Sequence, residues 1–199
     1  MDIQEYRGVE GLVAAEVIKD SSESYETGEV FEIAGVAEIS RTVNSSSATH
    51  YYDNKPAIVI NSDGEETITI STSVIPLDVK AKLLGRVYDE NLAMYIGGER
   101  KTKYFAIGYK TKLTDGTEMY VWRLKGTFND PDESNKTVDN STDGNGQQLV
   151  YTNISTIHKF AKNNNESAPN FIVNGSKTKG DIATFFDTVK TPDTFVVRG

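Results

Sequence analysis

The segment 103–128 constrains the fold most, because it has the pattern of a β-hairpin whose turn fixes the pairing of both strands. Asp115-Gly116 stands between two runs rich in β-branched and aromatic residues. Asp-Gly is among the strongest short-range signals for a two-residue hairpin turn. Closing the turn there predicts that Tyr109 lies opposite Trp122, with both side chains on the same face. We therefore expect a sheet whose two faces differ in chemistry.

One face of this hairpin is predicted to be apolar and the other basic. The apolar face would carry Phe105, Ile107, Tyr109, Leu113, Tyr120, Trp122, Leu124 and Phe128. The basic face would carry Lys110, Lys112, Arg123 and Lys125. Because the aromatic rings lie on the opposite face, the basic residues lack the stacking partners typical of a surface that binds nucleic acid. We expect them to face water or an acidic patch on a neighbouring subunit.

The composition is typical of a single globular domain over residues 1–199, with 37% hydrophobic residues. The formal net charge of -8 argues against a protein that grips nucleic acid, because such grip comes from Lys and Arg side chains that neutralise phosphates. The chain has no cysteine, which excludes disulfides and thiolate metal sites. No apolar run approaches the roughly 20 residues that span a bilayer, so we expect no membrane association.

Strand patterns dominate the rest of the chain. Alternating apolar and polar residues predict strands at 9–18, 29–43, 57–61, 66–74, 92–96, 148–160 and 171–173, with a turn at 61–64. Pro76 and Gly85 are placed to begin and end a helix, and a second short helix is expected at 181–187. Two long polar loops and a C-terminal tail are predicted at 44–56, 129–146 and 188–199. This order predicts a mainly β fold, a β-sandwich or open barrel with one flanking α-helix.

No pattern of a catalytic or cofactor-binding site stands out. His50 and His158 form no metal-spaced pair, and structural roles are expected for both. The first positions of a calcium loop are matched by Asp139, Ser141, Asp143 and Gly144. The twelfth position requires a bidentate Glu but is Val150, so we expect no bound ion there. The sequence thus predicts no enzyme, no cofactor and no metal site.

Short segments along almost the whole chain have an order and spacing that are found together in one family. They are Arg7-Gly8-Val9, Gly35-Val36-Ala37-Glu38-Ile39-Ser40, Tyr51-Tyr52-Asp53-Asn54, Gly108-Tyr109-Lys110-Thr111-Lys112, Lys125-Gly126-Thr127-Phe128 and Phe185-Phe186-Asp187-Thr188-Val189. In this order the chain resembles the major tail proteins, or tail tube proteins, of phages with long non-contractile tails that infect Gram-positive bacteria.

This resemblance implies a β-sandwich subunit with a flanking helix, six copies to a ring, and rings stacked into a hollow tube through which genomic DNA is ejected. The implied partners are further copies of the chain and other tail proteins, such as the tape measure, terminator and distal tail proteins. Double-stranded DNA would pass through without specific binding. The implied location is the virion, after assembly in the cytoplasm of the bacterial host. The family has no catalytic residues to transfer.

Three sets of residues would carry this role. Glu32 and Glu38, on the polar side of the 29–43 pattern, are candidates for an acidic lining that repels DNA phosphates. The candidate contacts between rings are Asn44, Ser45, Ser46, Ser47, His50, Tyr51 and Tyr52, with the 129–146 loop as second choice. The basic residues of the hairpin are expected to meet an acidic patch of the next subunit in the ring.

A different class of function also fits the strand-rich sequence. In a monomeric carbohydrate-binding β-sandwich, exposed aromatic residues such as Tyr51 and Tyr52 would form a platform for a sugar. A glycosidase is a more distant alternative, because carboxylates are plentiful but no pair of them stands out. Finding rings or tubes rather than a glycan-binding monomer would discriminate between assembly and the binding module.

Overall fold

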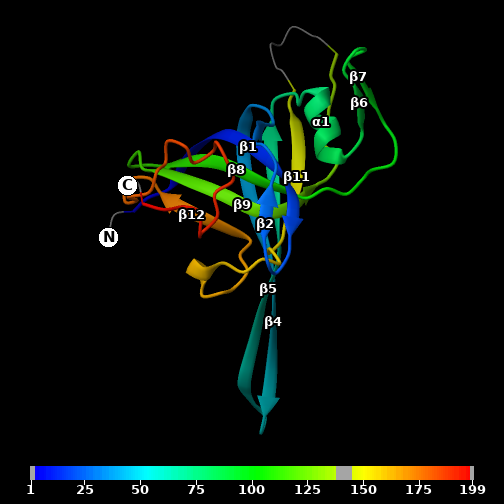
Figure 1. The fold of residues 1–199 in the computed structure, drawn as a ribbon. Helices are drawn as coiled ribbons and strands as arrows, with labels where there is room; N and C mark the ends of the chain where they lie inside the picture. Colours follow the sequence, from blue (N-terminus) through cyan, green and yellow to red (C-terminus); the bar gives the residue numbers. More distant parts are fainter. Residues whose placement is uncertain (1–2, 138–144, 198–199) are drawn as a thin grey trace.

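The computed structural model describes residues 3–137 and 145–197, with only the backbone of 61–63. It consists of a body from which one long two-stranded arm projects (Figure 1). Within the described residues the strands are β1 (Tyr6–Asp20), β2 (Tyr25–Thr27), β3 (Phe31–Glu32), β4 (Val36–Tyr52), β5 (Lys55–Thr72), β6 (Val87–Asp89), β7 (Met94–Ile96), β8 (Phe105–Leu113), β9 (Glu118–Phe128), β10 (Asp132–Glu133), β11 (Gln147–Asn153) and β12 (Asn170–Asn174). The helices are α1 (Leu77–Leu84) and the short 3₁₀ helix η1 (Ala161–Asn163).

Most of the strands form one large antiparallel sheet, in the order β2-β1-β8-β9-β11-β5-β4. Three short strands extend it, with β3 paired to β1, β10 to β11 and β12 to β9. The separate hairpin of β6 and β7 stands beside α1 at the end of the body away from the arm (Figure 1). The expected mainly β fold with a short α-helix is confirmed.

The sheet curls until β1 and β4 come close to each other. No ladder joins these two strands in the described part of the chain, so the sheet is not a closed barrel. A groove of about 550 Å³ marks the opening, and its lining includes Val9, Ile39, Tyr109 and Arg123. One long edge of the sheet, along β4, is therefore left without a neighbouring strand in the described residues.

Both faces of the β8–β9 hairpin are buried over most of its length, which explains the apolar runs at 105–107 and 119–122. One core contains Ile107, Tyr109 and Val121, and it extends to Ile70 of β5 and Leu83 of α1. A second core lies on the opposite face of the hairpin. Its members include Ala106, Tyr120, Trp122, Leu124, Phe160 and Phe185.

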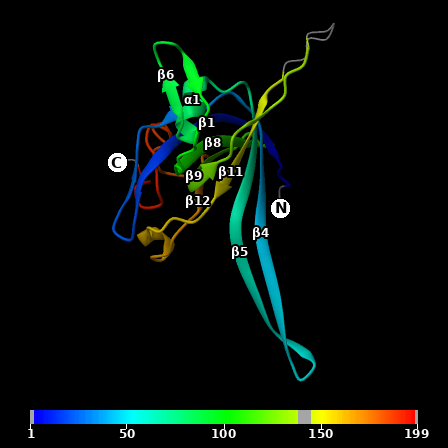
Figure 2. The same cartoon turned by 90° about the vertical axis from the view of Figure 1, so that its right-hand side faces the viewer.

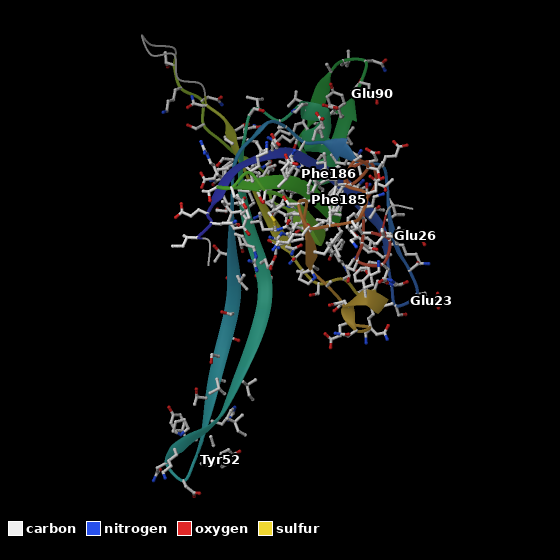
Figure 3. All side chains as sticks on the ribbon, turned by 90° about the vertical axis from the view of Figure 1, so that its left-hand side faces the viewer. Glu23, Glu26, Tyr52, Glu90, Phe185 and Phe186 are labelled. Atoms are coloured by element: carbon white, nitrogen blue, oxygen red, sulfur yellow. The ribbon has the colours of Figure 1, made fainter. Side chains whose placement is uncertain are left out.

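The C-terminal third of the chain covers the second core. The Trp122 indole N–H donates to the Phe185 carbonyl at 3.1 Å, and Phe185 and Phe186 lie inside the body in Figure 3. The Phe195 ring packs against the Phe185 ring with the ring centroids 5.4 Å apart, and Thr191 is buried. The described part of the predicted tail, 188–197, therefore packs onto the body. The segment 181–187 forms turns, so the short helix predicted there was wrong.

The turn of the hairpin differs from the predicted one. The Leu113 N–H donates to the Thr117 carbonyl at 2.8 Å, so the loop contains three residues, 114–116. Gly116 ends this loop with φ of 86°, the left-handed conformation that a three-residue hairpin loop requires. The prediction of a two-residue turn was therefore wrong.

The extra loop residue changes which side chains share a face. Tyr109 pairs with Val121 and Gly108 pairs with Trp122, so Tyr109 and Trp122 lie on opposite faces of the sheet. An irregularity after Phe105 restores the predicted pairing of Phe105 with Gly126. The single apolar face predicted for this hairpin is therefore replaced by two, one for each core.

The helix follows its sequence signals. Pro76 accepts the Lys80 N–H at 2.8 Å in the first turn, and Gly85 ends the helix with φ of 61°. Ala81 and Leu84 of the predicted stripe are buried, but Leu77 is 47% exposed. The predicted helix is confirmed, whereas its predicted apolar stripe is only partly buried.

The largest correction concerns the segment 44–56, which is not a loop. It completes β4 and begins β5, and these strands pair past the turn predicted at 61–64, with an irregularity in register between Val43 and Ser45. The strand predicted at 148–160 is shorter than expected, because β11 ends at Asn153. At 44–56 the polar residues of an exposed strand pair were interpreted as a loop. At 154–160 residues outside a strand were interpreted as part of one.

Candidate functional site

The arm, defined as residues 44–64, is the most exposed regular structure in the described chain. Here β4 and β5 pair only with each other, from Ser45 opposite Asp63 to Tyr52 opposite Lys55. The two residues of the turn, Asp53 and Asn54, have φ of 51° and 59°. Positive φ at both positions is typical of the type I′ turn, which matches the twist of a two-stranded ribbon. Figures 1 and 2 show the arm extending well away from the body, and Figure 3 places Tyr52 at its far end.

Apolar side chains of the arm are exposed on both of its faces. Ile58, Val59 and Ile60 are 48%, 58% and 54% exposed, and as successive strand residues they alternate between the two faces. Tyr51 and Tyr52 are also exposed near the turn. An isolated two-stranded ribbon is marginally stable in water, and its two outer edges offer unpaired backbone groups. The arm therefore has the chemistry of a surface that a partner covers.

The root of the arm is fixed by a buried carboxylate. Glu66 Oε1 accepts from Arg41 Nη2 of β4 at 2.7 Å. Glu66 Oε2 accepts from Arg123 Nη1 of β9 and from Asn153 Nδ2 of β11, both at 2.9 Å. Arg123 also donates to the Tyr109 hydroxyl at 3.3 Å. We call Arg41, Glu66, Arg123 and Asn153 the root cluster, since it joins the four neighbouring strands β4, β5, β11 and β9 where the arm begins.

The root cluster keeps Glu66 ionised. Burial alone raises the pKa of the Glu66 carboxyl, but the hydrogen bond from Arg41, the charge of Arg123 and the hydrogen bond from Asn153 outweigh it. The pKa of Glu66 is consequently held below its ordinary value. The arginine side chains differ in exposure, because Arg123 is buried whereas nearly half of the Arg41 side chain is exposed.

The four basic residues of the hairpin do not form one exposed face. Arg123 is 4% exposed and bound to Glu66, and Lys125 is buried with its Nζ 2.7 Å from Asp20 Oδ2. Lys110 and Lys112 lie beside Glu10 and Glu118 instead, with Lys110 Nζ 2.8 Å and 3.0 Å from the two carboxylates. The hydrogen bond that Lys110 donates to the Glu10 carboxylate raises the pKa of Lys110. The expected basic face is therefore wrong, because the altered register and the buried acids divide these side chains.

Glu32 and Glu38, the candidate lining residues, are both exposed. Glu32 is in β3 opposite Val13, and Glu38 is in β4 opposite Ser71, next to an irregularity in the β4–β5 pairing. They do not lie on one continuous strand, because the chain leaves the sheet between β3 and β4.

The second-choice loop, 129–146, is partly regular. Asp132 and Glu133 form β10, which pairs with the start of β11. The calcium-like residues Asp139, Ser141, Asp143 and Gly144 lie outside the described residues. Among the residues that the structure describes, no group of three or more His, Asp or Glu side chains is placed to hold a metal ion.

The histidines occupy different environments. His50 is exposed on the arm, among the candidate ring contacts. His158 is half-buried, and its ring lies edge-on to Phe160 with the centroids 5.1 Å apart. The sequence analysis missed the neighbouring carboxylate of Asp20, which accepts the backbone N–H groups of Ile157 and His158 as well as the Lys125 ammonium. No local signal pointed to this contact, since Asp20 and Lys125 are 105 positions apart.

Comparison with known proteins gives no assignment: no protein-family model matches the chain, and a search of curated proteins finds no significant match. In the described part of the chain, no helix is long and apolar enough to cross a membrane.

Proposed function

We propose that this chain is a structural subunit that assembles with identical copies, six to a ring, into the stacked hollow tail tube of a phage with a long non-contractile tail. The arm carries this proposal. Its free edges and the exposed residues Ile58, Val59 and Ile60 favour enclosure by another copy. The resemblance of the ordered sequence segments supplies the class of assembly. The arm also contains every residue of the candidate ring contact, from Asn44 to Tyr52.

In this proposal each subunit is an open barrel or sandwich whose free edge continues into the next copy. The opening between β1 and β4 leaves such an edge within the described residues. If six subunits each gave about four strands to an inner barrel, about 24 strands spaced about 4.8 Å apart and tilted about 40° would enclose a backbone diameter of about 48 Å. A DNA duplex passes through such a bore with water around it.

The conduit would be passive toward DNA. A net charge of -8 and exposed carboxylates such as Glu32 and Glu38 favour repulsion of phosphates. With a Debye length of about 8 Å at physiological salt, that repulsion acts across a thin water layer. The pairing of Lys110 and Lys112 with Glu10 and Glu118 limits the opposing positive charge. The tape measure, terminator and distal tail proteins are the further partners that we propose, with assembly in the host cytoplasm and a final place in the virion.

The test removes the arm without disturbing the body. Replacing residues 46–62 by Asn-Gly joins Ser45 to Asp63, which already face each other, through a two-residue hairpin turn. Because residues 46–60 of the removed segment are all exposed, we expect a folded, soluble subunit. Size-exclusion chromatography and negative-stain microscopy of concentrated protein should show rings or tubes for the wild type and none for the shortened variant.

A matched variant changes only the apolar character of the arm. Replacing Ile58, Val59 and Ile60 by Thr keeps β-branched side chains in the strand, and we expect it to weaken ring stacking. A wild-type protein that stays monomeric at high concentration and is retained on a glycan column would contradict the proposal and favour the carbohydrate-binding alternative. Tyr51 and Tyr52 are successive residues of β4, an arrangement that does not favour a flat sugar platform on one face.

A further inference from the structure

We propose that the Glu66 carboxylate is a positioning residue that sets the direction in which the arm leaves the body. The pairing of β11 with β5 ends where Asn153 lies opposite Glu66. Beyond that point β5 is held by β4 alone. Going along β5 toward the arm, Glu66 is thus the last residue paired with a strand on both sides, β4 and β11. Its carboxylate lies at the boundary between this three-stranded region and the free ribbon.

The ladder hydrogen bonds of the arm do not fix its direction. They join β4 to β5, and both strands move together when the ribbon swings about its root. Only contacts that cross from the ribbon to the body oppose such a swing. The bonds of Glu66 to Arg123 and Asn153 are contacts of this kind, made at 2.9 Å to two different body strands.

Arg41 completes the constraint from the other side of the ribbon. Its guanidinium reaches Glu66 Oε1 from β4 at 2.7 Å, so the carboxylate holds both β4 and β5 just outside the arm. The charged groups around Glu66 are Arg41 of β4 and Arg123 of β9, and Tyr109 of β8 bonds to Arg123 from behind. The neighbouring carboxylate Glu65 is exposed and makes no ion pair among the described residues, which makes it a natural control.

The length of the arm makes a small change at the root easy to measure. The nine residues of β4 from 44 to 52 extend about 30 Å at about 3.3 Å per residue. A swing of about 20° at the root would therefore move the turn by about 10 Å. For assembly, which rests on the proposed function, such a displacement would carry the arm out of register with its contact on the next copy.

The experiment measures the arm in the isolated full-length subunit. Because the chain has no cysteine, Glu23→Cys in the body and Lys55→Cys at the turn provide two unique positions for spin labels. Figure 3 shows Glu23 on the body, well separated from Tyr52 at the end of the arm. Double electron–electron resonance then gives the distance distribution between the labels. It is recorded for the unmodified root and for Glu66→Gln, Arg41→Gln and Glu65→Gln.

We expect Glu66→Gln and Arg41→Gln to broaden the distribution and shift its maximum, and Glu65→Gln to leave it unchanged. Arg41 is half-exposed, so Arg41→Gln decides the question if Glu66→Gln does not fold. Among the described residues, the Glu66 carboxylate holds β4 only through Arg41, so a folded Arg41→Gln variant with an unchanged distribution would overturn the proposal that the carboxylate sets the direction of the arm. A wild-type subunit that never assembles would contradict the proposed function and leave this measurement valid.

Discussion

At the scale of single residues, the charges that matter most are the buried ones. The Asp20 carboxylate accepts from the Lys125 ammonium at 2.7 Å and from the Ile157 and His158 backbone N–H groups. Burial alone raises the pKa of Asp20, but these three donors outweigh it and hold the pKa below its ordinary value. The site joins the end of β1, β9 and the loop after β11, so it secures the covering of the second core.

Asp20→Asn should therefore destabilise the fold by about 3 kcal/mol at pH 7, because it leaves a buried lysine without its counter-charge. The folded-state pKa of Asp20 is lowered, so its contribution is present above about pH 4 and is lost as the pH falls through the lower, folded pKa. Urea unfolding at pH 7 and at about pH 3 should show the difference between variant and wild type shrinking in acid.

A matched control for Asp20→Asn is Glu26→Gln, which removes a mostly exposed carboxylate 3.9 Å from Lys19. It should change the free energy of unfolding by less than about 0.5 kcal/mol at either pH. An equal effect of the two substitutions would mean that the buried pair has no special weight.

The sequence could not predict these charge pairs. It located Arg123 and Lys125 correctly on a strand, but their burial depends on Glu66 and Asp20, which are 57 and 105 positions away. A basic residue in a strand pattern looks the same whether it faces water or a distant acid. Only the tertiary arrangement distinguishes the two.

At the scale of elements, sequence signals that act on their own backbone gave correct predictions. Signals whose effect depends on neighbouring strands did not. Pro76 and Gly85 set the helix, because both act on their own backbone. Asp115-Gly116 marked a hairpin turn but not its length, since the dipeptide fits two-residue and three-residue loops alike. The strand predicted at 57–61 is part of β5 and is confirmed. The arm portion of β4 was missed because a Ser-rich segment in a two-stranded ribbon lacks the apolar alternation of a half-buried sheet.

The packing of β9 against β11 gives a prediction at this scale. A Cβ atom on Gly126 would overlap the Thr152 carbonyl oxygen and the Tyr151 ring. Gly126→Ala should therefore destabilise the protein by about 2 kcal/mol through overpacking, and it should lower the midpoint of urea unfolding accordingly. Gly97→Ala is the matched control, because a Cβ there meets nothing within 4 Å. Equal stability of the two variants would contradict the close β9–β11 approach.

At the scale of the whole molecule, the main feature is the division into a body and an arm. The body buries both faces of its central hairpin with its own chain, whereas the arm leaves its faces and edges to be covered. The number of strand patterns in the sequence was enough to predict the mainly β fold class. It could not anticipate the shape, because a long strand and a strand–loop–strand segment have similar compositions here.

The proposed conduit gives a prediction for the assembled tube. Replacing Glu32 and Glu38 by Lys should slow genome ejection while tubes still form, because positive charge on the lining attracts phosphates. Both side chains are exposed, so we expect little change in subunit stability. Ejection followed by dye fluorescence should show the slower rate, most clearly at low salt. Wild-type rates in both conditions would remove these two residues from the lining.

The two strands of the arm differ in polarity, and this difference bears on when copies of the chain would associate in the cell. A two-stranded ribbon with exposed edges is prone to aggregation, especially where it contains a run of β-branched apolar residues. In the arm, the apolar run Ile58-Val59-Ile60 of β5 pairs with a part of β4 that is rich in serine and threonine. Ala48 lies opposite Ile60, and Thr49 lies opposite Val59. If the chain polymerises as proposed, we expect this polar partner strand to keep newly made chains dispersed at low concentration, so that polymer growth starts on a template where many weak contacts add up.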